Sequence, residues 1–150
     1  MRLIVLLSFL IGITSSNAQT DFRADVLNMI NTIRQSPGEC NNIYKRPARQ
    51  LSWSDLLEQS AMTHAREMKQ YDYLDHYSID GKDIGDRIDV TGYEWRLVGE
   101  NLAFGQRNLK TVFSDWLESP EHCRLLYHPH MKELGMARVG EYWVLHLGRQ

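Results

Sequence analysis

Six histidines are the residues of this sequence best suited to chemistry near neutral pH, because a neutral imidazole is both the commonest metal ligand and a general base. They are His64, His76, His122, His128, His130 and His146. Their spacing matches no known zinc motif, since the chain contains neither H-E-x-x-H nor C-x-x-C. The chain also lacks G-x-S-x-G, a phosphate-binding loop and a glycine-rich dinucleotide turn. Local motifs therefore predict no reaction.

Two of these histidines lie within regular apolar patterns. His64 lies on the apolar stripe of a predicted helix, where a half-buried structural histidine with a single hydrogen bond is the expected role. His146 alternates with Leu145 and Leu147 in a predicted strand, so its side chain faces away from theirs. A histidine at this position is explained equally well by exposure to solvent and by a functional role.

The first eighteen residues have the pattern of a secretory signal peptide. Met1-Arg2 is a short positive start, Leu3 to Ile13 is almost entirely apolar, and Ser16-Asn17-Ala18 places small residues before a cleavage site. The apolar run is about half of the roughly 20 residues that a membrane-spanning helix needs. We therefore expect residues 1–18 to be removed and residues 19–150 to form one secreted or periplasmic domain without a transmembrane anchor.

Export decides how the two cysteines are interpreted. An oxidising compartment allows thiols to pair, so Cys40 and Cys123 are expected to form one disulfide. Such a bond closes a long loop, which the chain-entropy model values at roughly 4 kcal/mol. A catalytic cysteine would need a free thiolate beside a base, and pairing removes that candidate.

The composition is that of one folded domain. Hydrophobic residues make up 43% of the 150 residues and charged residues 24%, which is enough apolar material for one core. The formal net charge is −2, without the concentrated positive charge that attracts a phosphate backbone. Nucleic acid is therefore not expected as a partner.

Two helices are predicted in the first half of the mature chain. Apolar residues recur every three to four positions from Asp21 to Gln35, as on one face of a helix. A second helix is expected from a capping box of Ser52 and Asp55 to about Tyr71. Residues 39–50 have no periodicity and are expected to form an irregular connection.

The second half predicts shorter elements that follow a loop carrying His76, from Asp72 to Gly85. They are a helix over 84–90, a strand over 95–98 leading into Gly99-Glu100-Asn101, a helix capped by Asn108, a helix with Ser119 as N-cap and Pro120 first, and strands at 134–139 and 142–147. Early helices followed by a terminal hairpin predict an α+β layered domain.

Several phrases, in this order, resemble the CAP superfamily of cysteine-rich secretory, antigen 5 and pathogenesis-related proteins, most of all its small bacterial secreted members. They are Asp75-His76, Asp80-Gly81, Gly92-Tyr93, Gly99 to Gly105, Trp116 to Cys123, Gly135 and Tyr142-Trp143. The likeness runs from Leu51 to Gly148. It implies an α-β-α sandwich with a small central antiparallel sheet, and a surface cleft lined by histidines and acidic residues.

The resemblance also implies which residues line that cleft. His76 matches the first cleft histidine of the family, Glu100 matches the acid of its G-E-N-L phrase, and His122 matches the histidine of a bacterial S-P-G-H phrase. These three side chains are the expected ligand cleft and the expected ligands of a divalent metal such as zinc. Cys123 directly after His122, with Cys40 upstream, looks like a bacterial subgroup in which the two cysteines are bridged.

Two positions depart from the family pattern. Eukaryotic members carry a second glutamate where this chain has Ser119, and a further histidine in a G-H-Y-T-Q phrase that aligns with Tyr142. The cleft is therefore incomplete in its eukaryotic form, and His122 is the residue expected to fill the vacant side.

Three functional readings follow from this incomplete cleft. The first is a non-enzymatic binding or interaction module for a small lipid-like or cell-envelope ligand, since the resemblance implies lipid or sterol binding, signalling and defence. The second is a metal-dependent hydrolase in which His76, Glu100 and His122 hold the ion and a water attacks. The third is a structural envelope protein. No catalytic residue is identified, and a monomer is the default expectation.

Overall fold

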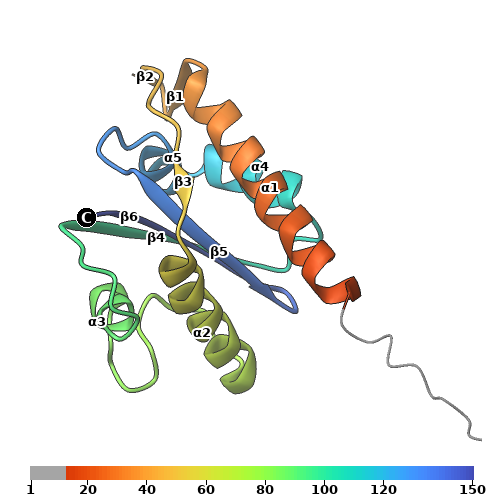
Figure 1. Ribbon diagram of the computed structural model, residues 1–150. Coiled ribbons are helices and arrows are strands. Elements are labelled where there is room, and N and C mark those ends of the chain that lie inside the picture. Colours follow the sequence, from red (N-terminus) through yellow and green to blue (C-terminus); the bar gives the residue numbers. More distant parts are fainter. Residues whose placement is uncertain (1–12) are drawn as a thin grey trace, which may run out of the picture.

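A four-stranded sheet with helices on both faces forms the structure, a computed structural model that describes residues 13–150 (Figure 1). The elements are α1 (Ile13–Gln35), β1 (Gly38–Cys40), β2 (Ile43–Lys45), β3 (Ser52–Trp53), α2 (Asp55–Tyr71), α3 (Ile84–Asp89), β4 (Leu97–Phe104), α4 (Leu109–Glu118), α5 (Pro120–Leu126), β5 (Glu133–Val139) and β6 (Tyr142–Arg149). The predicted α+β sandwich is confirmed. Most of the predicted signal peptide lies outside the described residues, and its last six residues belong to α1. None of the described helices is long and apolar enough to cross a membrane.

The sheet has the strand order β3-β5-β6-β4. The three long strands pair antiparallel, as expected, whereas the two-residue β3 joins the edge of β5 in parallel. The hairpin of β5 and β6 turns at Gly140-Glu141, with Val139 opposite Tyr142. Because β6 is paired on both sides, its residues are almost all buried.

Successive residues of the central strands face opposite layers. On β6, Trp143, Leu145 and Leu147 pack in the core that also contains side chains of α1, α4 and α5. Tyr142 and Val144 pack against Ala61, Ala65 and Met68 of α2. Figure 1 shows α1, α4 and α5 on one face of the sheet and α2 and α3 on the other. This alternation places His146, like Val144, on the α2 side.

Helix α2 begins at Asp55 and not at the predicted capping box. Ser54 is its N-cap and accepts a hydrogen bond from the Leu57 amide, whereas Ser52 pairs with Glu133 in the sheet. The Ser52–Asp55 box is therefore wrong: the parallel pairing of Ser52 and Trp53 with β5 keeps the chain extended until Ser54. The helix ends at Tyr71, as predicted, with Asp72 in the left-handed conformation.

Two other expected boundaries are wrong. Residues 39–50 are not wholly irregular, because β1 and β2 form a short hairpin whose turn residues Asn41 and Asn42 have positive φ. Asparagine tolerates that conformation better than most residues. The Asn41-Asn42 pair is therefore the local sign of a turn in a segment that has no apolar periodicity. Strand β4 extends to Phe104 and so contains Gly99-Glu100-Asn101, since every residue of β4 pairs with β6.

The predicted disulfide between Cys40 and Cys123 is confirmed. It joins the β1–β2 hairpin to α5, and both cysteines are fully buried beside Tyr127. No free cysteine is present in the part of the chain that the structure describes.

Candidate functional site

Glu100 is the centre of a buried polar cluster. Its Oε1 accepts a hydrogen bond from His76 Nδ1 at 2.7 Å, and its Oε2 accepts one from Arg87 Nη2 at 2.8 Å and one from His146 Nε2 at 2.7 Å. The Glu100 side chain is only 2% exposed and that of Arg87 5%, whereas that of His76 is 57% exposed. We call these four residues the Glu100 cluster.

Strand register brings His146 into this cluster. Glu100 of β4 pairs directly with His146 of β6, and directly opposed residues have side chains on the same face of a sheet. The interpretation of His146 as an exposed residue is therefore wrong, because it is fully buried on the α2 side. Tyr142, which aligns with the family's second histidine, is not in the cluster, since it pairs with Phe104 and its hydroxyl donates to Asp72.

Arg87 of α3 holds the loop that carries His76. Its Nη1 donates to the carbonyls of His76 and Lys82, both at 2.9 Å, while its Nη2 donates to Glu100. One guanidinium therefore joins the loop, α3 and β4. Arg87 was not among the predicted site residues; its only signal in the sequence is a basic residue beside Ile88 on the buried side of a short amphipathic helix.

His64 has the structural role that was predicted for it. The ring is fully buried on α2, and its Nε2 donates to the carbonyl of Asp75 at 2.9 Å. Burial lowers the pKa of this imidazole, which favours the neutral form. Because Asp75 directly precedes His76, the bond from α2 fixes the position of His76 over the cluster.

Ion pairing keeps Glu100 charged. Burial opposes ionisation, but the hydrogen bonds from His146 and His76 and the charge of Arg87 outweigh it, so the pKa of Glu100 lies well below its usual range. The hydrogen bond to Glu100 in turn raises the pKa of His76, against the effect of burial. Since Nδ1 is used in that bond, Nε2 is the ring nitrogen of His76 that remains for another partner.

His122 lies near this cluster without bonding to it. Its carbonyl accepts a hydrogen bond from Asn101 Nδ2 at 3.2 Å, and burial, followed by the charge of His76, lowers the pKa of its ring. The three residues expected to hold a metal do not fit that role in this arrangement, because both oxygens of Glu100 are already engaged. Within residues 13–150, no group of three or more His, Cys, Asp or Glu side chains is placed to hold a metal ion.

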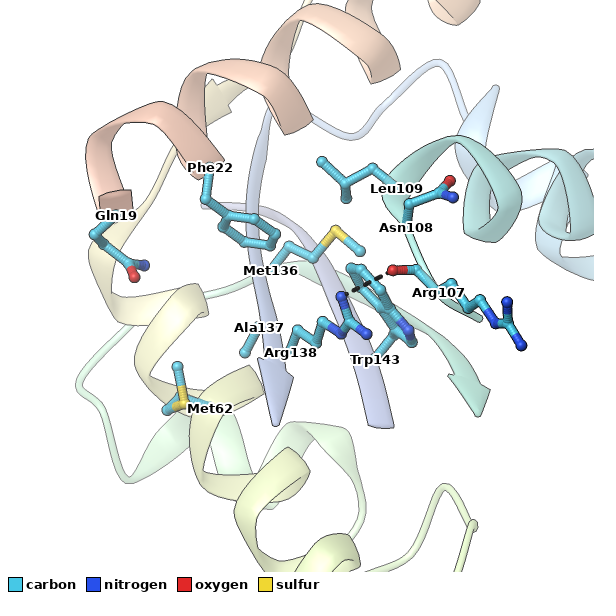
Figure 2. Close-up of a pocket in the computed structure, with 10 residues that line it drawn as sticks. All are labelled: Gln19, Phe22, Met62, Arg107, Asn108, Leu109, Met136, Ala137, Arg138 and Trp143. Carbon is cyan, nitrogen blue, oxygen red and sulfur yellow. Dashed lines mark hydrogen bonds between the residues drawn. The ribbon is translucent and has the colours of Figure 1, made fainter. Parts of the chain in front are cut away.

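An apolar pocket of about 310 Å³ lies elsewhere, where α1, α2 and the start of α4 meet the β5–β6 hairpin (Figure 2). Its apolar lining is Phe22, Met62, Leu109, Met136 and Trp143, and Gln19, Asn108 and Ala137 complete the wall beside two arginines. This volume is at the lower end of the roughly 300–1,000 Å³ of small-molecule sites, which are also mostly apolar with a few polar groups.

Two arginines, Arg107 and Arg138, lie at the rim of this pocket, which we call the arginine-rimmed pocket. Arg138 stacks on the ring of Trp143, 4.3 Å from its centroid, and donates to the carbonyls of Gly140 and Arg107. Both guanidinium groups belong to exposed residues. In Figure 2 the guanidinium of Arg138 lies over Trp143, whereas that of Arg107 points away from the other lining side chains. Arg138 therefore supplies the positive charge at the rim, and the interior is apolar. This pocket was not predicted from the sequence, because its residues come from five separate elements.

A family model described as the cysteine-rich secretory protein family, CAP, matches residues 27–145. The curated protein YkwD of Bacillus subtilis is 26% identical over 124 residues, which cover 81% of this chain and 45% of YkwD. The membrane protein YlbC of the same organism is 24% identical, over 83% of this chain and 34% of its own length. The chain therefore spans less than half of the curated relatives that it matches.

Two solved structures share the fold. An extracellular protein of Bacillus anthracis that contains an SCP domain has a TM-score of 0.76 at 22% identity, covering 87% of this chain and 41% of that one. An outer surface protein of Borrelia burgdorferi has a TM-score of 0.71 at 20% identity, covering 92% of this chain and 96% of that one. At these identities the likeness concerns the arrangement of helices and strands alone.

Proposed function

This chain belongs to the cysteine-rich secretory protein (CAP) family, and from that premise we propose that it is an extracellular binding module without enzymatic activity. Its ligand is an amphiphile with one apolar chain and an anionic head, held in the arginine-rimmed pocket. The observation that carries this proposal is the pocket itself, in which an apolar interior is bordered by Arg107 and Arg138.

The chemistry of the pocket sets the class of ligand. Met136 and Trp143 are almost fully buried and form an apolar floor, so an aliphatic chain placed there leaves water. Arg138 is fixed over Trp143 by its two bonds to carbonyls, so little of its freedom is lost when it binds an anion. A guanidinium pairs well with a carboxylate or a phosphate. Lipid binding is also among the family functions that the resemblance implies.

The Glu100 cluster supports this reading by its internal pairing. Among the described residues, the three hydrogen bonds that the Glu100 carboxylate accepts come from side chains of the cluster, and they join the loop, α3, β4 and β6. Metal-dependent hydrolysis at His76, Glu100 and His122 has less support, because a metal would have to displace one of those donors. Turnover of a peptide or ester that is abolished by His76→Ala and by Glu100→Gln would contradict a purely binding role.

A titration with dodecanoate tests the pocket. We expect one equivalent to bind, measured by calorimetry, and to change the fluorescence of the protein, since Trp143 lines the pocket. Met62→Glu places a charge in the wall and should abolish binding, whereas Gln70→Glu adds the same charge to the exposed end of α2 and should not. Absence of binding, or equal effects of the two variants, would rule the proposal out.

The uncharged analogue dodecanol separates the role of the rim from that of the interior. Arg138→Gln should weaken dodecanoate binding about tenfold, the value of one lost charge-assisted contact. Binding of dodecanol should change far less. If both ligands lose affinity equally, the arginine supports the pocket and does not recognise the anion.

The exported state of the protein is part of this proposal. The similar protein of Bacillus anthracis is described as extracellular, and the signal-peptide pattern predicts cleavage before Gln19. N-terminal sequencing of protein recovered outside the cytoplasm should therefore begin at Gln19, and native mass spectrometry of the same sample should show a monomer. A sequence that begins at Met1 would contradict the predicted cleavage.

A further inference from the structure

A second cavity, of about 550 Å³, lies at the opposite end of the β5–β6 hairpin and has a strongly basic lining. Its walls contain Arg49, His130, Lys132 and Arg149, together with Gln50, Pro129 and Met131. None of the described residues that line it carries a carboxylate, although the chain as a whole has a net charge of −2. Lys132 and Arg138 are six residues apart along the β5 segment, so this basic cavity lies about 20 Å from the arginine-rimmed pocket.

The cations of the basic cavity are free to bind an external anion. Within the described residues, none of Arg49, Lys132 and Arg149 has a carboxylate within 4.0 Å of its charged nitrogens. The nearest acid along the chain, Glu133, points to the α3 side and accepts a hydrogen bond from Tyr93. The Nε of Arg149 is buried and has no hydrogen-bond partner in the described part of the chain.

A buried guanidinium adds positive charge beneath the cavity. Arg34 of α1 is fully buried and has no acidic partner among the residues described. It donates to four carbonyls, those of Arg49, Leu126, His128 and Met131. Burial lowers its pKa to about 10, so it stays charged at neutral pH. A concave surface lined by one sign of charge concentrates the field and attracts counter-ions.

Hydrogen bonds fix the backbone segments that carry these cations before any ligand arrives. The Nε of Arg34 donates to the carbonyl of Arg49, and the amide of Ala48 donates to the carbonyl of Arg34. The Lys132 carbonyl accepts from Ser52, and its amide donates to Gly148, next to Arg149. Segments from three distant parts of the sequence are therefore tied to one another. Such preorganisation lowers the entropy cost of binding.

We propose that this basic cavity binds a phosphate group carried on a larger anionic molecule. A phosphate accepts from several cations at once, and a guanidinium matches its oxygens in a two-pronged contact while an ammonium acts as a point charge. One carboxylate cannot neutralise the three permanent cations Arg49, Lys132 and Arg149, which favours a phosphate. The cavity is also larger than a single phosphate needs, which favours a phosphate carried on a larger molecule. The carrier is a soluble phosphorylated molecule or the headgroup of an anionic phospholipid. The site does not depend on the pocket proposed above, so either proposal can fail alone.

Inorganic pyrophosphate is the probe for this site. Titrated into the full protein in metal-free buffer and followed by amide nuclear magnetic resonance, it should shift the signals of residues 49–50, 130–132 and 149. Binding should weaken from low to physiological ionic strength. Shifts confined to other residues, or no shift at low ionic strength, would overturn the proposal, and this measurement needs no variant to fold.

A charge-matched pair of variants gives a second test. Lys132→Gln with Arg149→Gln should weaken pyrophosphate binding about tenfold or more, as expected for lost charge-assisted contacts. Arg66→Gln with Lys110→Gln removes the same charge from exposed positions on α2 and α4 and should have little effect. Equal losses in the two double variants would show that only the net charge of the protein matters and would overturn the site.

Vesicles distinguish the two carriers. If the phosphate belongs to a lipid, the protein should bind vesicles of phosphatidylcholine mixed with phosphatidylglycerol and not vesicles of phosphatidylcholine alone. The Lys132 and Arg149 double variant should then lose that binding. Pyrophosphate binding without vesicle binding assigns the site to a soluble phosphorylated molecule. Failure to bind either probe would refute the proposal, and dodecanoate binding would be unaffected.

Discussion

Three side chains from three separate elements donate hydrogen bonds to Glu100: His76 from a loop, Arg87 from α3 and His146 from β6. Charges buried this deeply need an ion partner or several hydrogen bonds, because desolvation costs several kcal/mol per ion. The cluster is therefore a structural connection between the loop and the sheet as much as a potential site. A substitution that removes one charge of the cluster should leave the opposite charge buried without its partner.

Replacement of Glu100 by Gln should strongly destabilise the protein. Arg87 would remain buried without its carboxylate, and loss of one partner of a buried pair costs about 3–5 kcal/mol. Urea unfolding at neutral pH measures this loss. Glu94→Gln, at an exposed position, is the control and should change stability by less than about 0.5 kcal/mol. A Glu100→Gln protein as stable as this control would show that the cluster contributes nothing to the fold.

His76 should make stability depend on pH. Its pKa is raised in the folded protein by the bond to Glu100, so it stabilises the fold fully below the unfolded value of about 6.5 and loses that effect as the pH rises through the folded pKa. The free energy of unfolding should therefore fall from about pH 6 to pH 8 by more in the parent than in His76→Gln. The lowered pKa values of His64 and His122 act in the opposite direction. Burial is the largest cause of both and is kept in His76→Gln, whereas the smaller effect of the His76 charge on His122 is lost in that variant.

Titration of the His76 ring by nuclear magnetic resonance checks the cause directly. The midpoint should lie above the usual value in the parent and return toward it in Glu100→Gln, if that variant folds. An equal pH dependence of unfolding in the parent and in His76→Gln would contradict the interpretation.

At the scale of elements, helix α2 is pressed directly against the sheet at its first turn. The backbone of Leu57 and Glu58 lies over Gly135 of β5, so closely that an added Cβ would lie 2.0 Å from the Glu58 amide nitrogen. This close approach lets the buried face of α2, which includes His64, pack directly against β5 and β6. The position of the loop over the cluster thus depends on a glycine from a distant strand.

Gly135→Ala should consequently destabilise the protein more than other glycine substitutions in the sheet. Backbone cannot move aside as a side chain can, so we expect a loss of about 1–3 kcal/mol or more. Gly99→Ala is the matched control on β4, where the added Cβ would meet only the end of the Leu125 side chain. Chemical denaturation of both variants compares them. Equal losses would show that the close approach of α2 is not what requires glycine.

At the scale of the whole molecule, a disulfide and a mixed sheet unite distant segments. Cys40 and Cys123 are separated by 83 positions and their bond joins the hairpin after α1 to α5. The arginine-rimmed pocket and the basic cavity lie at opposite ends of the β5–β6 hairpin. Since α1 contributes to the walls of the first and supports the second through Arg34, the position of α1 affects both.

Reduction of the disulfide should lower the melting temperature. The chain-entropy model values a loop of this length at roughly 4 kcal/mol, and the expected loss is of that order. Calorimetry with and without dithiothreitol measures it, and Cys40→Ala with Cys123→Ala is the control that should not respond to the reductant. If reduction leaves the melting temperature unchanged, the disulfide does not contribute to the stability of the fold.

Elements with strong local signals, and the order of the family phrases, are predictable along the chain alone. The apolar period of α2, the Ser119-Pro120 start of α5 and the pairing of the only two cysteines need no knowledge of distant contacts. The resemblance to the CAP family predicted the sandwich, and it also predicted that His76 and Glu100 lie together. Local propensity and short motifs are properties of neighbouring residues, so they can be read along the chain.

Which side chains meet depends on long-range contacts that the linear sequence does not reveal. His146 joins Glu100 because β4 and β6 pair in one register, and a shift by one residue would turn it to the other face. Arg87 enters the cluster because α3 packs beside β4, and the basic cavity exists because Arg49, Lys132 and Arg149 converge from three segments. Register and packing are set by long-range contacts, and that is why the sequence predicted the framework while the structure decided the sites.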